Sequence, residues 1–357
     1  MDKIIYIRKE LNNNEKRTPI IPSDIKILIN NNYIIYVESS QNRIFNDEDY
    51  EKEGAFITIL SWNHPKFSNA LIIGLKELDN LNNLNNHQHV YFAHCYKKQN
   101  NSIQILKAFK KSNSILYDFE YFLNSNKFLK RIISFGFYAG TAGAFIGLLQ
   151  YYSYLMNKKD IKDLEYYDNQ EILINDLKNI SLEITYNSTP NPNPQIVIIG
   201  PNGNCGKGVQ YILNQLNLKY DILISSDNIN ILSLKKYNII FNCILLDENY
   251  NNIWFNQDNI SEITSLLLIV DISCDNEKLN NPIQLKYPNT TFQNPVYQIN
   301  EFIKIIAISN LPSFLPKDSS TYFSNKCTQL LLEYSNDIVP VNWINNKNIF
   351  YKMVNNI

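Results

Sequence analysis

The sequence predicts an α/β protein of two domains, each built around a largely parallel β-sheet. Three observations predict this fold class. The chain has 357 residues, enough for two domains of ordinary size. Hydrophobic residues form 45% of it, a composition typical of chains with packed cores. Short runs rich in Ile, Val and Tyr alternate with longer polar segments, as in sheets whose parallel strands are joined by helices.

The strands of the two predicted sheets come from apolar runs. In the first domain the runs lie at 4–8, 33–38, 70–75, 90–95 and 114–119. In the second they lie at 196–200, 221–227, 238–246 and 265–273. Continuous apolar runs of this length are typical of strands buried on both faces, so we expect parallel sheets covered by helices.

The longest apolar stretch, residues 135–149, lies between the two sets of strands. It is shorter than the roughly 20 residues that cross a bilayer. Gly136, Gly140, Gly143 and Gly147 follow one another at helical spacing and fall on one helix face. A face without side chains lets another backbone approach closely, so we expect a buried helix at a domain junction rather than a membrane helix.

The C-terminal tail carries a further expected helix at 328–337, after the last strand of the second domain. A tail with its own helix can pack back on the first domain. We therefore expect a discontinuous first domain, 1–134 plus 318–357, and a second domain, 135–317. The two would be Rossmann-like domains that flank a cleft.

Charge and cysteine content narrow the class of protein. The 33 basic and 34 acidic residues nearly cancel, which argues against a nucleic acid or an anionic membrane as the main partner. The five cysteines are odd in number and form no CxxC pair, which indicates a reduced intracellular protein without a zinc ribbon. The start, "MDKIIYIRKE", has no signal-peptide core. We expect a soluble, cytoplasmic protein that acts as a monomer.

The loop "GPNGNCGKG" at 200–208 holds four of the ten glycines in the chain. A Walker A loop needs Gly five residues before its Gly-Lys pair and a hydroxyl after it. Here Pro201 stands five residues before Gly206, and Gly208 takes the hydroxyl position. The loop is therefore not a P-loop.

A dinucleotide-binding loop fits the same letters with one inserted residue. Gly200, Gly203 and Gly206 match G-x-G-x-x-G, after an apolar strand and before a helical segment. Asp227 follows at the distance expected for a ribose-binding carboxylate. A plain tight turn would explain the glycines but neither the flanking elements nor Asp227. The chain has no Arg beyond Arg131 that could hold a 2′-phosphate, so we expect NAD rather than NADP.

Polar side chains follow two of the predicted strands in the first domain. Lys76 and Glu77 come after one strand, and His94, Lys97 and Gln99 come at the end of another. The carboxyl ends of parallel strands are where α/β enzymes carry their chemistry. Lys76 could act as a base if burial or nearby cations lower its pKa, and His94 titrates near neutrality. The alternative is that both residues only cap strand ends.

The first domain also contains arginines and histidines that are candidates for binding a ligand or a metal. Arg17 and Arg131 persist in a chain that otherwise uses Lys, which indicates bidentate binding of carboxylates, with a surface salt bridge as the alternative. His87 and His89 lie in an Asn-rich segment and are expected to be solvated. On a strand, His89 and His94 would face opposite sides, so we expect no metal site.

Eight segments together resemble one family, in its order along nearly the whole chain. They are "EKRTP", "FNDEDYEKEGA", "IIGLKEL", "YFAHCYKKQ", "LYDFEYF", "RIISFGFYAGTAGA", "IIGPNGNCGKG" and "LPSFLP". The sequence resembles the NAD-dependent, lysine-forming saccharopine dehydrogenases. It is more distantly similar to the two-domain alanine dehydrogenases and transhydrogenase subunits.

The resemblance implies oxidation of the secondary amine of saccharopine by NAD, then hydrolysis of the imine to lysine and 2-oxoglutarate, the last step of the aminoadipate route of lysine biosynthesis. By motif position, Lys76 resembles the base that takes the amine proton, and His94 the acid–base group for attack of water and collapse of the carbinolamine. Glu15, Glu77 and Glu120 would tune the charge of the cleft. The residues that would bind substrate are Arg17, Lys97, Gln99, Arg131, Phe135, Asp271 and Ser273. Those that would bind NAD are Lys130, Gly200, Gly203, Asn204, Gly206, Asp227, Val270, Ser309 and Leu311.

The chain departs from the family at Ser309, where relatives tend to carry an acidic residue, and this would weaken cofactor binding through Lys97. The tail "VNNI" lacks a peroxisomal Ser-Lys-Leu signal, which favours the cytosol. Cys205 lies inside the glycine loop, and Cys243 ends a strand expected beside it, so the two could form a redox-sensitive disulfide. Two unrelated reduced cysteines are the alternative.

Two other functions compete with this interpretation. An alanine-dehydrogenase-like amino acid oxidoreductase would bind a single substrate carboxylate, so the set of Arg17, Arg131 and Lys97 counts against it. A non-catalytic NAD-binding regulatory protein would be expected to lose Lys76 or His94, and both are present.

Overall fold

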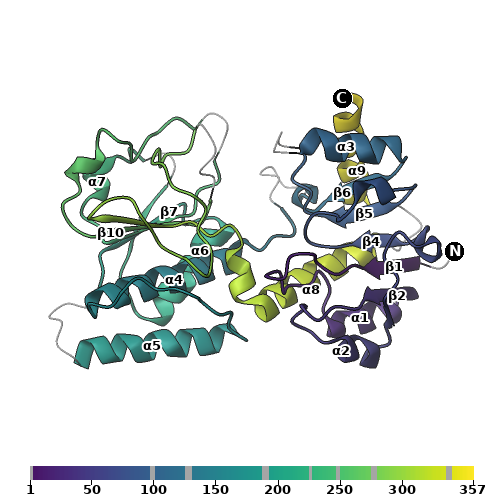
Figure 1. The fold of residues 1–357 in the computed structure, drawn as a ribbon, viewed down its shortest axis with the longest axis horizontal. Coiled ribbons are helices and arrows are strands. Elements are labelled where there is room, and N and C mark those ends of the chain that lie inside the picture. The colour runs from purple at the N-terminus through teal and green to yellow at the C-terminus, as the bar shows by residue number, and fades with distance from the viewer. Residues whose placement is uncertain are drawn as a thin grey trace. The chain divides into compact units, whose positions relative to one another are not determined.

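The computed structural model describes residues 3–96, 101–124, 131–186, 193–224, 227–246, 250–274, 280–334 and 340–357. The chain divides into two compact units (Figure 1). Unit 1 is Met1–Ser134 together with Pro316–Ile357, and unit 2 is Phe135–Leu315. Each unit contains one six-stranded sheet. Among the described residues, no helix combines the length and the apolar character needed to cross a membrane.

The sheet of unit 1 has the strand order β3-β2-β1-β4-β5-β6, and every pairing in it is parallel. This is the order of a dinucleotide-binding Rossmann sheet. Its strands are β1 (Lys3–Ile7), β2 (Tyr33–Glu38), β3 (Phe56–Thr58), β4 (Leu71–Ile73), β5 (Gln88–Tyr91) and β6 (Ile115–Asp118). Its helices are α1 (Pro22–Ile29), α2 (Asp47–Lys52), α3 (Ser102–Lys111), α8 (Pro316–Tyr334) and α9 (Val341–Asn355), with short 3₁₀ turns η1 (Pro65–Phe67), η2 (Leu81–Asn83) and η3 (Phe119–Tyr121).

The two C-terminal helices, α8 and α9, belong to unit 1 although they follow unit 2 in the sequence. Ser320 and Ser324 of α8 accept the backbone N–H groups of Thr18 and Ile21. Trp343 of α9 is buried and donates to the carbonyl of Leu330. Side chains of α8 therefore satisfy backbone groups that precede α1.

The sheet of unit 2 has the order β11-β12-β10-β9-β7-β8, and only the β11–β12 pair is antiparallel among the described strands. Its parallel part has the flavodoxin-like order, with the switch point between β7 and β9. The strands are β7 (Ile196–Ile199), β8 (Asp221–Leu223), β9 (Ile239–Asn242), β10 (Leu267–Asp271), β11 (Tyr297–Gln298) and β12 (Ile303–Ile306). The helices are α4 (Gly136–Leu155), α5 (Gln170–Tyr186), α6 (Asn204–Gln215) and α7 (Ile231–Leu234), with turns η4 (Ile260–Glu262) and η5 (Leu311–Phe314).

Helices α4 and α6 pack backbone against backbone, as the glycine spacing predicts. A side chain at Gly140 would overlap the carbonyl of Cys205, and one at Gly208 would overlap the carbonyl of Phe137. At Gly147 a Cβ would lie 2.8 Å from Val270 of β10. The prediction of a buried helix is confirmed, and so is the prediction of two parallel α/β sheets.

Some elements differ from the prediction. The expected strand at 90–95 ends at Tyr91, before His94. The described part of the expected helix at 328–337 belongs to α8, which begins at Pro316, and residues 335–337 lie outside the described residues. Strands β3, β11 and β12 were not predicted. The first two have only three and two residues, which leaves no periodic signal to detect.

Candidate functional site

Lys76, one of the candidate catalytic residues of unit 1, lies at the switch point of its sheet. Strands β1 and β4 are neighbours there, and Ile7 pairs with Ile73 at their carboxyl ends. The chain leaves β1 toward β2 on one side and reaches β4 on the other. In open α/β sheets, ligands bind outside the carboxyl ends of the strands at such a point. Lys76 stands three residues beyond β4, at this edge.

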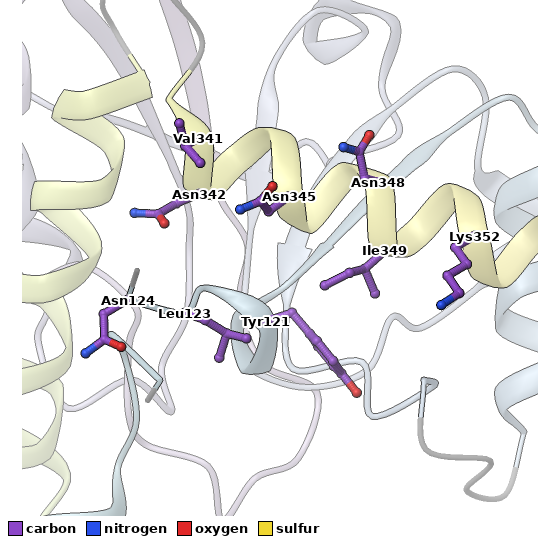
Figure 2. Close-up of a pocket in the computed structure, with 9 residues that line it drawn as sticks. All are labelled: Tyr121, Leu123, Asn124, Val341, Asn342, Asn345, Asn348, Ile349 and Lys352. Carbon is purple, nitrogen blue, oxygen red and sulfur yellow. The ribbon is translucent and has the colours of Figure 1, made fainter. Parts of the chain in front are cut away.

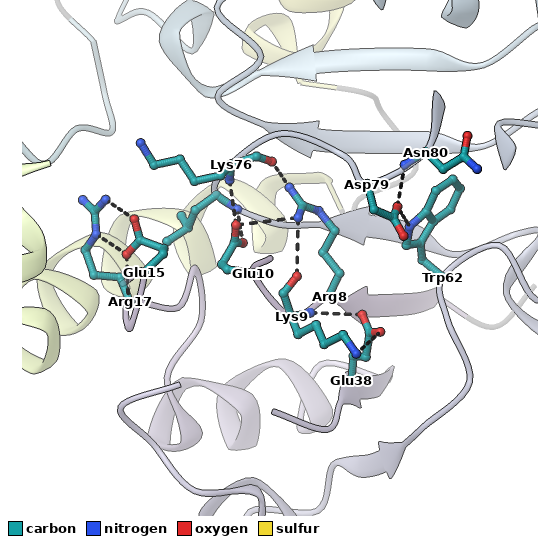
Figure 3. A network of polar contacts seen from close by, with 11 residues as sticks. Arg8, Lys9, Glu10, Glu15, Arg17, Glu38, Trp62, Lys76, Asp79 and Asn80 are labelled. Atoms are coloured by element: carbon teal, nitrogen blue, oxygen red, sulfur yellow. Dashed lines mark hydrogen bonds and ion pairs between the residues drawn. The ribbon is translucent and has the colours of Figure 1, made fainter. Parts of the chain in front are cut away.

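Two charged residues that follow β1 hold the backbone of Lys76 (Figure 3). The Glu10 carboxylate accepts the N–H groups of Leu75 at 2.7 Å and of Lys76 at 3.0 Å. The Arg8 guanidinium donates to the carbonyl of Lys76 and lies 3.6 Å from Glu10. The sequence analysis missed Arg8 and Glu10, and the only available signal was the rarity of Arg in the chain.

Arg17 and Glu15 form a buried bidentate pair beside Lys76. Nε and Nη2 of Arg17 donate to the two carboxylate oxygens of Glu15, at 2.7 and 2.5 Å. Burial works to raise the pKa of Glu15, but Arg17 and, more weakly, Lys76 hold that pKa below its ordinary value. Figure 3 shows the Lys76 side chain extending over this pair. The structure thus brings together three predicted residues.

His94, Glu120 and Arg131 form a second cluster in unit 1. Arg131 Nη2 lies 2.9 Å from Glu120 Oε1, and His94 Nδ1 lies 3.7 Å from the same oxygen. The Glu120 side chain is buried, whereas those of His94 and Arg131 are 37% and 34% exposed, so the imidazole and the guanidinium remain accessible to a ligand. His94 has a φ of 52°, in the left-handed region that non-glycine residues seldom occupy and that is often found at functional sites.

Asp118 supports this cluster from behind, and the sequence analysis missed it. Its Oδ1 accepts the N–H of Glu120 at 2.9 Å. The side-chain amide of Asn346 on α9 binds both the N–H and the carbonyl of Asp118, at 3.0 and 2.8 Å. Burial raises the pKa of Asp118 to about 7, against the backbone N–H of Glu120. Its place at the end of β6, two residues before Glu120, was a signal that strand-end reasoning could have used.

The remaining predicted residues of unit 1 are less informative. Glu77 is exposed next to Lys76. Lys97, Gln99 and Lys130 lie outside the described residues. A pocket of about 400 Å³ lies between η3 and α9 (Figure 2) and is lined by Tyr121, Leu123, Asn124, Val341, Asn342, Asn345, Asn348, Ile349 and Lys352. These described lining residues include no predicted site residue.

The expectation for two histidines was wrong. His87 and His89 are buried, with 4% and 0% of their surface exposed. Strand β5 begins at Gln88, so His89 is a strand residue, and it packs edge-on against Trp62 and against Phe109 of α3. The Asn-rich residues before β5 give no strand pattern, so the start of this strand could not be placed from the sequence. Because β5 ends at Tyr91, the argument that His89 and His94 face opposite sides of one strand does not apply either.

The glycine loop of unit 2 forms a cradle at the N-terminus of α6, at the switch point between β7 and β9. Gly200 has a φ of 87°, and a Cβ there would lie 2.8 Å from the carbonyl oxygen of Cys243 after β9. A Cβ at Gly206 would overlap the Gly200 carbonyl. In front of Gly203, the N-cap of α6, the nearest atom to a Cβ is 3.9 Å away. Gly203 and Asn204 are exposed, so the amide groups of this helix end face open space suited to a pyrophosphate.

Asp227 lies four residues beyond β8, not at the strand end as predicted. Its Oδ2 accepts the N–H of Ile224 at 2.7 Å, and the side chain is half-buried. The carboxylate therefore closes its own turn after the strand that neighbours β7. This is the strand from which a ribose-binding carboxylate comes in dinucleotide-binding sheets.

The other predicted residues of unit 2 differ in their burial. Asp271 is buried and accepts from Asn242, Ser273, the N–H of Cys274 and Tyr287, so protein groups occupy both of its oxygens. Burial raises its pKa, against these hydrogen bonds. Val270 and Leu311 are buried in the core, whereas Ser309 is exposed and Phe135 is half-buried at the start of α4.

Cys205 and Cys243 both remain thiols in the structure. Burial raises the pKa of Cys243 well above its usual range, and the neighbouring Cys205 adds to this. A thiol with a raised pKa is a poor nucleophile for disulfide exchange. A redox-sensitive bond between the two residues stays a prediction.

Comparisons with known proteins agree with this architecture. The family model "Alanine dehydrogenase/PNT, N-terminal domain" matches residues 6–142, and the corresponding C-terminal domain model matches residues 196–356. The chain is also similar in structure to an L-alanine dehydrogenase, with a TM-score of 0.68 at 12% identity, over 98% of this chain and 94% of that one. At this identity the similarity concerns the fold alone.

Two curated relatives are more similar in sequence. The saccharopine dehydrogenase [NAD(+), L-lysine-forming] of Schizosaccharomyces pombe is 31% identical over 368 residues, covering 98% of each chain. The enzyme of the same name from Candida albicans is 32% identical over 376 residues, covering 98% of this chain and 97% of that one. The chain therefore belongs to the family of NAD⁺-dependent, L-lysine-forming saccharopine dehydrogenases.

Proposed function

We propose that the protein oxidatively cleaves L-saccharopine with NAD⁺ and water to L-lysine, 2-oxoglutarate and NADH. The observation that carries the proposal is the pair of side chains able to accept a proton, Lys76 and His94, at adjacent strand ends of unit 1. Lys76 lies beside the Glu15–Arg17 pair, and His94 lies beside the Glu120–Arg131 pair. A basic amine and an imidazole, each next to an arginine, suit a substrate that must lose a proton while its carboxylates are held.

NAD fits the cradle of unit 2. The N-terminal amides of α6 would hold the pyrophosphate, Gly203 leaves the space it needs, and Asp227 would accept the ribose hydroxyl groups. Bound there, NAD⁺ supplies the hydride acceptor. Lys130, Asn204, Val270, Ser309 and Leu311 remain proposed cofactor contacts. For the buried Val270 and Leu311, such contacts would use main-chain atoms.

The proton transfers fall to the residues of unit 1. Lys76 would take the proton of the secondary amine as the hydride leaves the adjacent carbon. His94 would then take a proton from the water that attacks the imine carbon, and return it to the departing lysine amine. Glu120, 3.7 Å from His94, would stabilise the imidazolium in between. Glu15 and Glu77 would offset the positive charge around Lys76.

Arginine side chains would hold the substrate's carboxylates. Arg131 is one-third exposed and suited to a carboxylate at the mouth of the site. Arg17 already binds Glu15, which fixes the plane of its guanidinium. Lys97, Gln99, Phe135, Asp271 and Ser273 remain proposed substrate contacts. In this proposal residues 1–134 plus 318–357 form the substrate domain, and residues 135–317 form the NAD domain.

We place this activity in the cytoplasm and propose that the protein acts as a monomer. All five cysteines are thiols, which suits a reducing compartment. Light scattering on the purified protein tests the monomer, for which the expected mass is 41.7 kDa.

Replacing Lys76 by Met tests the proposed base. We expect kcat with saccharopine to fall by roughly 10²–10⁴-fold, with little change in the Kd of saccharopine, because general-base catalysis acts in the transition state. Lys9→Met is the matched control, since Lys9 lies at the same end of the sheet but pairs with Glu38. An unchanged kcat in Lys76→Met would reduce Lys76 to a strand-end residue.

A further inference from the structure

We propose that Arg8 and Glu10 are positioning residues that hold Lys76 in its working geometry. This inference rests on the function proposed above. Strand β4 ends at Ile73, and backbone hydrogen bonds toward β5 continue only as far as the carbonyl of Leu75, which accepts the N–H of Phe92. The side chains of Arg8 and Glu10, which follow β1, hold the next peptide group, that of Lys76.

Arg8 and Glu10 bind both N–H and C=O groups of the Leu75–Lys76 segment. Glu10 accepts two consecutive N–H groups, those of Leu75 and Lys76, with its two carboxylate oxygens. Arg8 donates to the carbonyl of Lys76. The donor and the acceptor of Lys76's own backbone are thus both occupied by side chains of the neighbouring strand end, as Figure 3 shows.

The geometry needs an arginine and a glycine. The Arg8 guanidinium lies against the backbone of Gly74, where any Cβ would overlap it. Its planar fork reaches the Lys76 carbonyl with Nη2 while Nη1 stays 3.6 Å from Glu10. A lysine ammonium is a single point charge and could not satisfy both at once. This explains why Arg8 is one of only four arginines in the chain.

The position of the Lys76 amine depends on the position of the Lys76 backbone. The positive charge of Lys76 lies near enough to the buried Glu15–Arg17 pair to help lower the pKa of Glu15, and the bidentate contact fixes the position of that pair independently. If the Leu75–Lys76 segment moves, the amine moves relative to that pair and to the substrate. A misplacement of about 1 Å at a catalytic group can cost roughly 100-fold in rate. Arg8 and Glu10 would therefore act on kcat through Lys76 without touching substrate.

The chain offers a matched control for the burial of an arginine. Arg43 is as buried as Arg8, and it binds Asp47 at 2.6 Å, the carbonyl of Glu38 at 3.2 Å and the ring of Tyr50. None of these three contacts involves the Leu75–Lys76 segment. Arg8→Lys and Arg43→Lys should lose similar thermal stability, but only the first disturbs Lys76.

The experiment compares Arg8→Lys, Glu10→Gln and Arg43→Lys in the full-length protein, measuring kcat and KM for saccharopine and the Kd of NADH. Glu10→Gln keeps the shape of the side chain but can accept only one of the two N–H groups. We expect kcat to fall by about tenfold or more in Arg8→Lys and Glu10→Gln, with KM and the NADH Kd changed by less than about threefold. Arg43→Lys should keep kcat within about twofold.

A second readout needs no turnover. The acetylation rate of Lys76 by an amine-reactive ester, followed by mass spectrometry and referred to exposed Lys52, reports its environment. We expect Arg8→Lys and Glu10→Gln to change that ratio by about threefold or more, and Arg43→Lys to leave it unchanged.

The two readouts separate the possible failures. If saccharopine is not a substrate but the labelling ratio changes as expected, the proposed function fails and the positioning stands. If the variants match Arg43→Lys in both kcat and labelling, Arg8 and Glu10 are structural only and the inference is wrong. Should Arg8→Lys fail to fold, Glu10→Gln and the shorter Glu10→Asp decide the question by the same criteria.

Discussion

A single methyl group at Gly203 should weaken NAD binding while leaving unit 2 folded. A Cβ at this position would meet no atom nearer than the Gly200 carbonyl, at 3.9 Å. At Gly206, in contrast, a Cβ would overlap that carbonyl and lie 2.6 Å from the Cα of Pro201. The two glycines of one loop therefore serve different purposes, since Gly206 makes room for protein and Gly203 makes room for ligand.

The magnitudes follow from these distances. In Gly206→Ala the backbone must move by nearly 1 Å, and overpacking of this kind costs about 1–3 kcal/mol, partly offset by the better helix propensity of Ala. For a domain of this size a cost of 1–3 kcal/mol is roughly 2–12 °C in Tm. In Gly203→Ala the loss of a good N-cap residue costs only about 0.5–1 kcal/mol. Its methyl blocks hydrogen bonds to a charged pyrophosphate worth about 1.5–3 kcal/mol, or roughly 10–100-fold in Kd.

The assay combines a thermal melt with a fluorescence titration of NADH. We expect Gly203→Ala to melt close to the unaltered protein and to bind NADH at least about tenfold more weakly. Gly206→Ala should show the larger loss of Tm. If Gly203→Ala bound NADH as tightly as the unaltered protein, the pyrophosphate would not lie against the N-terminus of α6.

Three further perturbations test the packing and the buried charges. Gly140→Ala should destabilise unit 2 by about 1–3 kcal/mol in a denaturant melt, because its Cβ would overlap the Cys205 carbonyl, and a melt unchanged from the unaltered protein would contradict that packing. Burial holds the pKa of His89 well below 6.5, so its contribution to stability is present above about pH 6.5 and is lost as the pH falls, by up to about 1.4 kcal/mol per unit. His89→Phe should flatten this acid limb, and equal slopes would show that His89 is already protonated when folded. Burial raises the pKa of Asp118 to about 7, so its contribution to folding stability is present below about pH 4 and is lost as the pH rises to 7. Over that range the stability of Asp118→Asn should rise relative to that of the unaltered protein by up to about 4 kcal/mol. A stability difference between the two proteins that does not change with pH would contradict the raised pKa.

Features set by local sterics and by apolar runs were predictable from the sequence. Glycine spacing at 140 and 147 indicated a close helix contact, since the absence of a side chain is a local property that the fold cannot alter. The strand runs predicted both sheets, and strand ends pointed to Lys76 and His94. The short strands β3 and β11 carried no such signal, because two or three residues give no period.

The contacts that hold the candidate site could not be predicted in the same way. Glu10 meets Leu75 across 65 positions, and Asn346 meets Asp118 across 228. Such contacts depend on which strands become neighbours, and the sequence pattern does not specify strand order. The prediction that His89 is solvated was wrong for another reason. Its polar neighbours outweighed the weak strand signal of a four-residue element.

Substrate-dependent formation of NADH is the most direct test of the account. Purified protein would be incubated with NAD⁺ and either saccharopine or alanine, and NADH, lysine and 2-oxoglutarate would be quantified together. We expect saccharopine to yield all three products in equal amounts and alanine to yield no NADH. NADH formation from alanine with a kcat/KM comparable to that for saccharopine, or none from saccharopine, would contradict it.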